Sequence, residues 1–167
     1  MSQALNEARH YEEETELQID EQERPEFHLS PRIGWMNDPN GFSCYGGKYH
    51  LFYQYYPYSS HWGPMHWGHA VSSDMIRWTY LPAALAPDEP YDRDGCFSGS
   101  AVTMRDGKQL LMYTGAVSEK EFGGAFVQTQ NLAVGDGLEY VKYKGNPVIT
   151  AADLPKGGSP YDFRDPK

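Results

Sequence analysis

The sequence repeats a unit of short strands and turns after 60 to 63 residues. Residues 47–53 (GKYHLFY) resemble residues 107–113 (GKQLLMY), and the Ala-Val pair at 70–71 recurs at 133–134. Each unit has room for four strands, and repeated four-stranded units are typical of β-propeller blades. A β-sandwich is the alternative fold for such a pattern. The 167 residues are enough for two blades and the start of a third, whereas a propeller has about four to eight.

Turn signals such as Asn-Gly, Gly-Gly and Asp-Gly divide the sequence after Pro25 into candidate strands. No apolar pattern of helix length separates these strands, which argues against a parallel βαβ fold. Asp74 and Asp136 are interpreted as turn residues of equivalent hairpins. The predicted class is therefore all-β, preceded by a short helix. The predicted strands are residues 41–45, 48–54, 65–72 and 77–81 in the first unit, and 96–104, 109–114, 126–134 and 139–143 in the second.

Acidic residues are concentrated in residues 1–27, which carry nine Asp and Glu against two Arg. The whole chain has 23 acids and 14 Lys and Arg, so the other 140 residues, with 14 acids and 12 bases, are nearly neutral. Ser2 is expected to cap a short helix that runs to about Glu16, with Leu5 and Ala8 on one face. We interpret residues 1–27 as a solvated acidic leader, with an interaction tail as the alternative.

The composition narrows the class of protein. A formal charge of −9 and a pI near 5.0 disfavour a nucleic-acid binder, and no stretch approaches the roughly 20 apolar residues of a membrane helix. Cys44 and Cys96 are too few for a disulfide framework and are interpreted as buried small residues. Their number, and the lack of a secretory signal, favour a cytoplasmic location. His61, His66 and His69 lack the spacing of a metal site, so no metal or other cofactor is expected.

Carboxylates stand where the predicted units begin. Asp38 precedes the first strand of the first unit, residues 94–100 (DGCFSGS) open the second, and Asp165 stands where a third would begin. Because the inner strands of a propeller converge on its axis, these segments are expected to form one pocket. Carboxylates, a hydroxyl and aromatic rings suit a sugar, and glycoside hydrolysis needs paired carboxylates. Taken alone, Asp38 is more simply explained as a turn residue.

A longer motif surrounds Asp38. Residues 35–41 (WMNDPNG) resemble the signature of the β-fructofuranosidases, glycoside hydrolase family 32. The resemblance covers about residues 26 to 167. The acidic leader followed by residues 27–31 (FHLSP) is most similar to the bacterial intracellular sucrose-6-phosphate hydrolase group. The further motifs that carry the resemblance are residues 52–54 (FYQ), 61–70 (HWGPMHWGHA), 78–82 (WTYLP), 97–101 (FSGSA) and 163–166 (FRDP).

The resemblance implies a retaining hydrolase of β-fructofuranosides, built on a five-bladed β-propeller that is usually followed by a β-sandwich. It assigns Asp38 as the nucleophile. It assigns Asp165 as the aspartate that holds fructose hydroxyls and stabilises the transition state, and it puts Trp35 in the apolar wall of the fructose subsite. The other subsite residues that it implies are Asn37, Gln54, Trp62, Phe97, Ser98 and Arg164.

The sequence departs from the family pattern after Asp165. The family's proton donor is a Glu in a Glu-Cys motif well downstream of Arg-Asp-Pro, and Glu119, Glu121 and Glu139 stand outside such a motif. We therefore expect residues 28–167 to be an incomplete propeller domain without the later blades or the sandwich. Such a chain should be inactive alone, and its exposed strand edges should favour self-association.

Three functional hypotheses follow for a chain whose expected partner is a small sugar, with no nucleic acid or membrane. The first is the N-terminal part of a hydrolase of sucrose or sucrose 6-phosphate. The second is a non-catalytic sugar-binding remnant. The third is a related propeller enzyme that acts on other furanosides or transfers fructosyl groups. Residues that recognise a 6-phosphate group are expected on the glucose side of the pocket.

Overall fold

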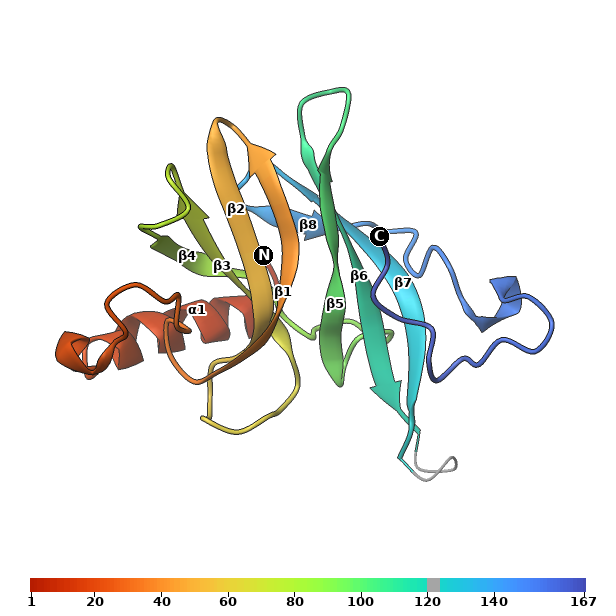
Figure 1. Cartoon of the computed structure of the whole chain (residues 1–167). Helices are drawn as coiled ribbons and strands as arrows, with labels where there is room; N and C mark the ends of the chain where they lie inside the picture. The colour runs from red at the N-terminus through yellow and green to blue at the C-terminus, as the bar shows by residue number, and fades with distance from the viewer. Residues whose placement is uncertain (120–123) are drawn as a thin grey trace.

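The structure, a computed structural model, describes residues 1–119 and 124–167. It contains two four-stranded antiparallel sheets and one α-helix (Figure 1). In each sheet the strands pair in the order in which they follow along the chain, so each sheet is a meander. The all-β prediction with a short preceding helix is confirmed. The first sheet consists of β1 (Trp35–Tyr45), β2 (Lys48–Tyr56), β3 (His66–Ser72) and β4 (Thr79–Leu85); the second consists of β5 (Gly95–Thr103), β6 (Gln109–Ser118), β7 (Phe126–Gly135) and β8 (Tyr140–Lys142).

Strand β1 begins six residues earlier than predicted, at Trp35 instead of Gly41. Asp38 therefore lies within a strand and not before it. The sequence suggested a turn because Pro39 lacks an N–H and Asn-Gly at 40–41 is a turn signal. Gly41 does adopt a positive φ, of 51°. Pairing with β2 overrides that signal: Trp35 lies opposite Tyr56, and two register shifts in β1 accommodate the proline and the glycine.

The two predicted turn aspartates are confirmed. The Oδ1 atom of Asp74 accepts hydrogen bonds from the backbone N–H groups of Ile76 and Arg77. Asp136 accepts in the same way from the second and third residues after it. These bonds lower the pKa of each carboxyl group, because they stabilise its ionised form. Because the turn after β3 extends further than predicted, β4 starts at Thr79 instead of residue 77.

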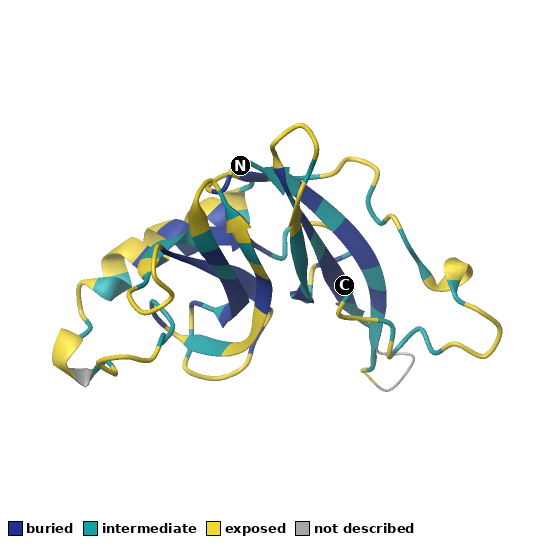
Figure 2. Cartoon of the chain, turned by 45° about the horizontal axis from the view of Figure 1, so that its top comes forward, coloured by how far each residue is buried: buried dark blue, intermediate teal, exposed yellow. Residues whose placement is uncertain are grey.

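Helix α1 spans Gln3–Glu16, and Ser2 caps it by accepting a hydrogen bond from the N–H of Leu5, as predicted. The helix is not solvated on all sides, so that part of the prediction is wrong. Leu5 and Ala8 are buried, and so are Arg9 and Glu12. Figure 2 shows the buried positions along one side of the helix, next to the first sheet. Single 3₁₀ turns occur at Glu21–Glu23 and Ala151–Asp153.

Two clusters of buried side chains hold these elements together. One lies between the sheets and takes residues from both, including Phe52, Trp67 and Leu111. The other lies between the first sheet and α1, and includes Leu5 and Tyr55. Burying an aliphatic or aromatic side chain contributes about 1.5–3 kcal/mol. The first cluster therefore joins the second sheet to the first.

The cysteines and histidines only partly follow expectation. Cys96 is buried, but Cys44 is exposed near the end of β1, so the prediction of two buried cysteines is wrong for Cys44. His66 and His69 are buried in β3, whereas His61 is exposed in the loop before it. Within the described residues, no group of three side chains is arranged to hold a metal ion. No helix of the described part is long and apolar enough to span a bilayer.

Candidate active site

A cleft of about 350 Å³ lies where β1 and β5 meet the last described residues of the chain. Figure 1 shows these two strands facing each other, with the C-terminal end close to the second sheet. Eight of the nine predicted site residues line this cleft. The lining residues are Asn37, Asp38, Gln54, Trp62, Phe97, Ser98, Phe126, Arg164 and Asp165.

Asp38 is exposed to the cleft at an irregular point of β1. The register shift between Met36 and Pro39 leaves it outside the regular pairing with β2. The Oδ2 atom of Asp38 accepts a hydrogen bond of 3.0 Å from Ser98 Oγ, which belongs to β5 of the other sheet. The bulge in β1 thus turns Asp38 toward a partner 60 residues away in the sequence.

Trp35 is the one predicted site residue outside the cleft lining. Its Nε1–H donates a hydrogen bond of 2.9 Å to Oδ1 of Asn37. The indole therefore contacts a residue that lines the cleft. Because Asn37 Oδ1 is engaged by the indole, the Nδ2 amide group of Asn37 is the part left to face a ligand.

Buried amides lie beneath Asp38 and Ser98. Gln54 in β2 donates from Nε2 to the backbone oxygen of Cys96 in β5, at 3.0 Å. Asn40 is 2 % exposed, and the amide orientation that satisfies both of its ends donates to Ser98 Oγ at 3.2 Å and accepts from Gln54 Nε2 at 3.0 Å. Asn40 thus joins two lining residues. The sequence marked it only as part of the motif at 35–41.

The segment that carries Arg164 and Asp165 is held by two buried side chains of the second sheet. Thr114 Oγ1 accepts a hydrogen bond of 3.0 Å from the N–H of Asp165, and Gln130 Nε2 donates to the oxygen of Phe163 at 2.7 Å. Thr114 and Gln130 lie opposite each other in β6 and β7 and bond to each other at 3.1 Å. Sequence reasoning missed both, because their proximity depends on strand register.

Asp165 has a positive φ of 59°. Aspartate is one of the few residue types other than glycine that adopts this left-handed conformation readily. Its side chain is about half exposed, and Oδ2 lies 3.7 Å from Nε of Arg164. A carboxylate and a guanidinium group therefore stand side by side at the edge of the cleft, where both can bind hydroxyl groups.

Three aromatic rings form one wall of the cleft. The Trp62 ring lies 6.3 Å from that of Phe97 and 6.1 Å from that of Phe126, and the two Phe rings are 5.1 Å apart, between centroids. Trp62 is half exposed, so its ring is free to contact a ligand. Sequence reasoning missed Phe126, which opens β7 and belongs to none of the motifs that it used.

The other glutamates considered from the sequence do not line the cleft. Glu139 pairs with Arg9 of α1, and Glu119 is absent from the lining residues. Glu121 lies outside the described residues. Within residues 1–119 and 124–167, the carboxylates of the cleft are therefore Asp38 and Asp165.

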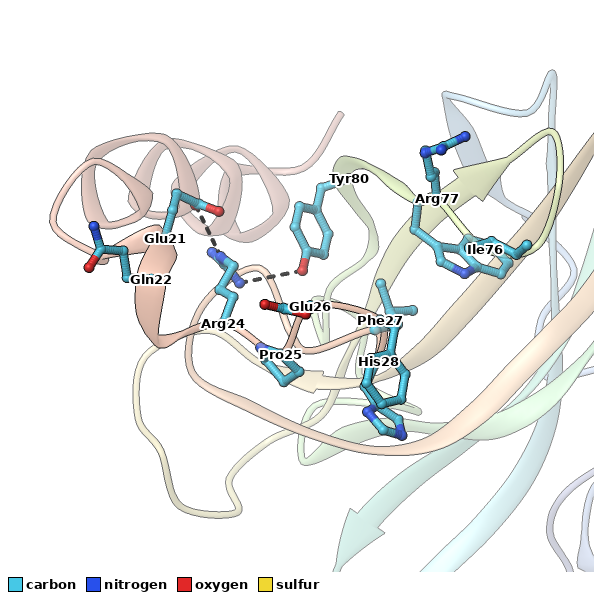
Figure 3. Close-up of a pocket in the computed structure, with 12 residues that line it drawn as sticks. Glu21, Gln22, Arg24, Pro25, Glu26, Phe27, His28, Ile76, Arg77 and Tyr80 are labelled. Carbon is cyan, nitrogen blue, oxygen red and sulfur yellow. Dashed lines mark hydrogen bonds and ion pairs between the residues drawn. The ribbon is translucent and has the colours of Figure 1, made fainter.

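A second groove, of about 640 Å³, lies between the segment after α1 and the β3–β4 turn (Figure 3). It contains none of the predicted site residues. Arg24 spans it, donating to Tyr80 Oη at 3.3 Å and pairing with Glu21 at 3.1 Å. The Arg24 guanidinium also lies over the Tyr80 ring, 5.3 Å from its centroid. This groove is where residues 21–29 rest on the first sheet.

Comparison with known proteins agrees with the motifs and the geometry. Residues 28–167 match the sequence model of the glycosyl hydrolases family 32 N-terminal domain. The chain is 48 % identical over 145 residues to a sucrose-6-phosphate hydrolase of Zymomonas mobilis, covering 86 % of this chain and 27 % of that protein.

Solved structures give the same result. The GH32 beta-fructofuranosidase BmSUC1 of Bombyx mori is similar with a TM-score of 0.84 and 47 % identity, over 97 % of this chain and 33 % of that one. A sucrose-6-phosphate hydrolase of Lactobacillus gasseri has a TM-score of 0.74 and 32 % identity, over 99 % and 32 %. The chain thus spans about a third or less of these relatives. The resemblance drawn from the motifs is confirmed: the chain belongs to glycoside hydrolase family 32.

Proposed function

We propose that this chain supplies the fructosyl-binding half of the active site of a retaining β-fructofuranosidase, with Asp38 as the nucleophile. The observation that carries the proposal is the convergence of eight predicted residues, from both sheets and the C-terminal segment, on one cleft. The Ser98 hydroxyl at 3.0 Å holds the Asp38 carboxylate in one orientation within that cleft. The family acts on sucrose and fructans, and its named relatives are hydrolases.

In this mechanism the Asp38 carboxylate attacks the anomeric carbon of a fructosyl unit. An ester bond to the sugar forms as the glycosidic C–O bond breaks, and the electron pair leaves on the departing oxygen, which takes a proton from a general acid. Asp165 and Arg164 bind sugar hydroxyls at the rim, and the aromatic wall covers the C–H face of the ring. Contacts that tighten as the oxocarbenium character develops contribute several kcal/mol.

The proposed substrates are sucrose, sucrose 6-phosphate and related β-fructofuranosides. Two similar proteins are named sucrose-6-phosphate hydrolase. A variant of the Bombyx mori enzyme was solved in complex with sucrose, and a fructan 1-exohydrolase from Cichorium intybus in complex with 1-kestose. A terminal β-fructofuranosyl unit is common to both sugars, and we propose that the lining of the cleft binds this unit.

We propose that the 167-residue chain alone does not hydrolyse sucrose. The described residues that line the cleft include Asp38 and Asp165 but no third carboxylate to serve as the general acid. General acid–base catalysis typically contributes about 10²–10⁴-fold. Sucrose has an alkoxide leaving group that needs protonation, so the loss falls on the step that breaks its glycosidic bond.

A β-fructofuranoside of a nitrophenol tests Asp38 without the general acid, because a nitrophenolate leaves without being protonated. We expect the chain to release nitrophenolate in a stoichiometric burst. The peptide that contains Asp38 should gain the mass of one fructosyl group. Asp38→Asn is the matched control, since it keeps the shape of the side chain. An adduct on another residue, or an equal burst from Asp38→Asn, would overturn the assignment.

The assay with sucrose and sucrose 6-phosphate completes the test. No reducing sugar above the Asp38→Asn control is the expected result. Sugar release that vanishes in the variant would show that the chain has a working acid, and the inactivity proposal would then be wrong. Fructose binding without a covalent adduct would favour a non-catalytic sugar-binding protein. Transfer of the fructosyl group to an added sugar would favour a fructosyltransferase.

We also propose a cytoplasmic location and self-association through strand edges. Both cysteines are free and Cys44 is exposed, which suits a reducing compartment. Strand β8 ends the second sheet with Val141 70 % exposed, so an apolar edge is open to another chain. Cell fractionation tests the location. Light scattering coupled to size exclusion tests the association, and a clean monomer would contradict it.

A further inference from the structure

We propose that helix α1 is a clasp that fixes the angle between the two sheets, with Arg9 as the positioning residue at its centre. The proposal concerns the packing of the sheets and does not depend on the chemistry of the cleft. It explains why a segment so rich in acids folds back onto the chain, and it gives a role to Arg9 and Glu139, which the proposed reaction does not use.

Arg9 joins the two sheets directly. Its Nε–H donates a hydrogen bond of 2.9 Å to the backbone oxygen of Ala83 in β4, the last strand of the first sheet. Its Nη1 group contacts both carboxylate oxygens of Glu139, at 2.8 and 3.1 Å. Glu139 stands in the turn between β7 and β8 of the second sheet. One guanidinium group thus bridges residues that are 56 positions apart in the sequence.

The Arg9 bridge is largely shielded from water. Arg9 is 9 % exposed, and Glu139 is about half exposed. Charge-assisted bonds of this kind are stronger than neutral ones when they are partly buried. The neighbouring Glu12 anchors the next turn of the helix by accepting from the N–H of Ala83 at 3.1 Å. Residue 83 is therefore held by two helix side chains through both of its backbone polar groups.

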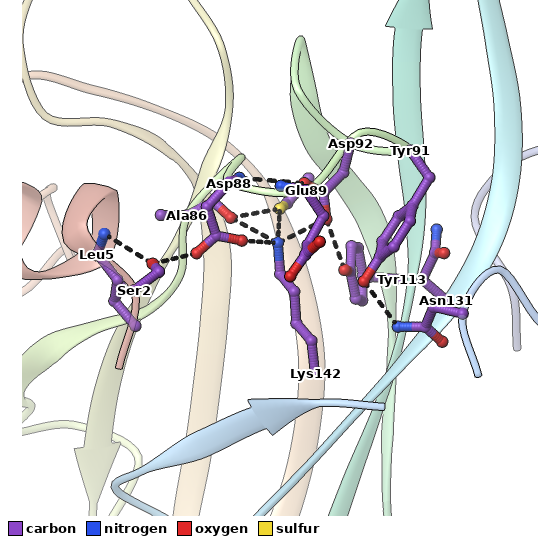
Figure 4. A network of polar contacts seen from close by, with 12 residues as sticks. Ser2, Leu5, Ala86, Asp88, Glu89, Tyr91, Asp92, Tyr113, Asn131 and Lys142 are labelled. Atoms are coloured by element: carbon purple, nitrogen blue, oxygen red, sulfur yellow. Dashed lines mark hydrogen bonds and ion pairs between the residues drawn. The ribbon is translucent and has the colours of Figure 1, made fainter. Parts of the chain in front are cut away.

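The first turn of the helix makes a second bridge. The Ser2 hydroxyl donates to Asp88 in the connection between β4 and β5 (Figure 4). Asp88 also pairs with Lys142 of β8, whose Nζ contacts Asp92 at 2.6 Å and the oxygen of Ala86 at 2.7 Å. The side chains of Asp88 and Lys142 are each 12 % exposed. The start of α1, the connection and the last strand of the second sheet thus form one polar network.

These bridges lie apart from the contacts at the cleft. Near the cleft, the sheets are joined by Trp67 Nε1–H, which donates to the oxygen of Phe97 at 3.1 Å, and by Ser98 with Asp38. The first buried cluster and the bond from Gln109 Nε2 to Ser43 Oγ also join the sheets. To these contacts α1 adds polar ones at β4 and at the β7–β8 turn, which further restrict the angle between the sheets. A change in the angle between the sheets would alter the 3.0 Å contact between Ser98 and Asp38, because these residues come from different sheets.

The test measures the distance between the sheets in the whole chain. Nitroxide labels are attached to the native Cys44, which is exposed, and to a cysteine introduced by Lys144→Cys, while Cys96 is buried and stays unlabelled. Pulsed dipolar spectroscopy then gives the distribution of distances between β1 and the end of the second sheet. We expect a single narrow peak that is lost in Arg9→Gln and in Glu139→Gln.

Matched variants separate the clasp from a general loss of stability. Arg24→Gln removes contacts to the oxygen of Pro31 and to Tyr80 of the first sheet. None of the described contacts of Arg24 reaches the second sheet, so the variant should leave the distance peak unchanged even where it lowers the unfolding midpoint. Arg9→Lys keeps the charge and should restore part of the narrow peak. Glu139→Gln changes a half-exposed side chain in a turn, so we expect this variant to fold. It therefore keeps the proposal testable if Arg9→Gln does not fold.

A second readout reports on the cleft itself. Trp62 labelled with 5-fluorotryptophan gives a ¹⁹F resonance that depends on its packing against Phe97 and Phe126 of the other sheet. We expect this resonance to shift or broaden in Arg9→Gln and Glu139→Gln and to stay in place in Arg24→Gln. An unchanged distance peak and an unchanged resonance in Glu139→Gln would overturn the proposal, whatever the outcome of the fructosylation assay.

Discussion

Ser98 Oγ and Asp38 Oδ2 form a hydrogen bond of 3.0 Å between residues of different sheets. The hydroxyl approaches a carboxylate that a bulge has taken out of regular strand pairing. The contact therefore depends both on the local shape of β1 and on how the sheets are packed. It is also the contact in the cleft whose loss is simplest to test.

Ser98→Ala should slow the formation of the fructosyl adduct on Asp38. A hydrogen bond to a charged group is worth about 1.5–3 kcal/mol, so a decrease of roughly 10- to 100-fold is expected. The nitrophenolate burst measures it. Ser100→Ala, in the same strand but outside the cleft, should leave the rate unchanged. Equal rates for wild type and Ser98→Ala would mean that the bond has no part in the attack.

Thr114→Val should release the segment that carries Asp165. The variant keeps the shape of the side chain but loses the acceptor for the Asp165 N–H and the donor to Gln130. The amide hydrogen of Asp165 should exchange faster with solvent, as measured by NMR. The free energy of unfolding should fall by about 1–3 kcal/mol. Thr103→Val, at the exposed end of β5, is the control. Retained protection in Thr114→Val would show that other contacts hold the segment.

Glu12 should make the chain less stable as the pH rises. Burial raises its pKa from the ordinary 4.5 to about 7, and the N–H of Ala83 and the charge of Arg32 only partly oppose that effect. The folded chain therefore binds more protons than the unfolded chain between these values. The contribution is fully present below about pH 4.5 and is lost as the pH rises through about 7, with a total of up to about 3 kcal/mol.

Urea unfolding at several pH values measures this dependence, and Glu12→Gln should flatten it. The charged and titratable groups around Glu12 include Arg9, Arg32, Tyr53 and Tyr55, and all four remain in the variant. Glu14→Gln, exposed on the same helix, should keep the slope of the wild type. A wild-type slope in Glu12→Gln would mean that another group binds the proton.

Phe126→Leu should weaken fructose binding by roughly 2- to 10-fold, which corresponds to the about 0.5–1.5 kcal/mol of an aromatic pair. Phe126 contacts Phe97 edge-on at 5.1 Å and completes the wall next to Trp62. Titration calorimetry with fructose measures the effect. Phe42→Leu removes an exposed ring that stacks on Tyr49 outside the cleft, and it should leave affinity unchanged.

The sequence predicts the strands well because turn residues and alternating apolar positions are local signals. Asp74 and Asp136 mark their hairpins through bonds to residues two and three positions away. The start of β1 could not be predicted in the same way, because Pro39 and Gly41 signal a turn. Pairing of Trp35 with Tyr56 outweighs that local preference.

The cleft could be predicted only as far as its motifs extend. Asp38, Ser98 and Asp165 stand within recognisable segments, so their meeting could be expected. Thr114 and Gln130 carry no motif and become a pair only through the register of β6 and β7. The burial of Glu12 could not be predicted from the sequence either, since its partner is a backbone N–H of β4, 71 residues away.

The meander order of both sheets has a consequence for the order of folding. Contacts within a sheet join neighbouring strands, whereas Ser98 and Asp38 are 60 residues apart and Asp165 and Thr114 are 51 apart. Closing a longer loop costs more chain entropy, so hairpins form before such contacts. We therefore expect the cleft to assemble last and to be lost first under mild denaturation. A solution whose circular dichroism is still that of native sheets can therefore already lack the contacts that form the proposed sugar site.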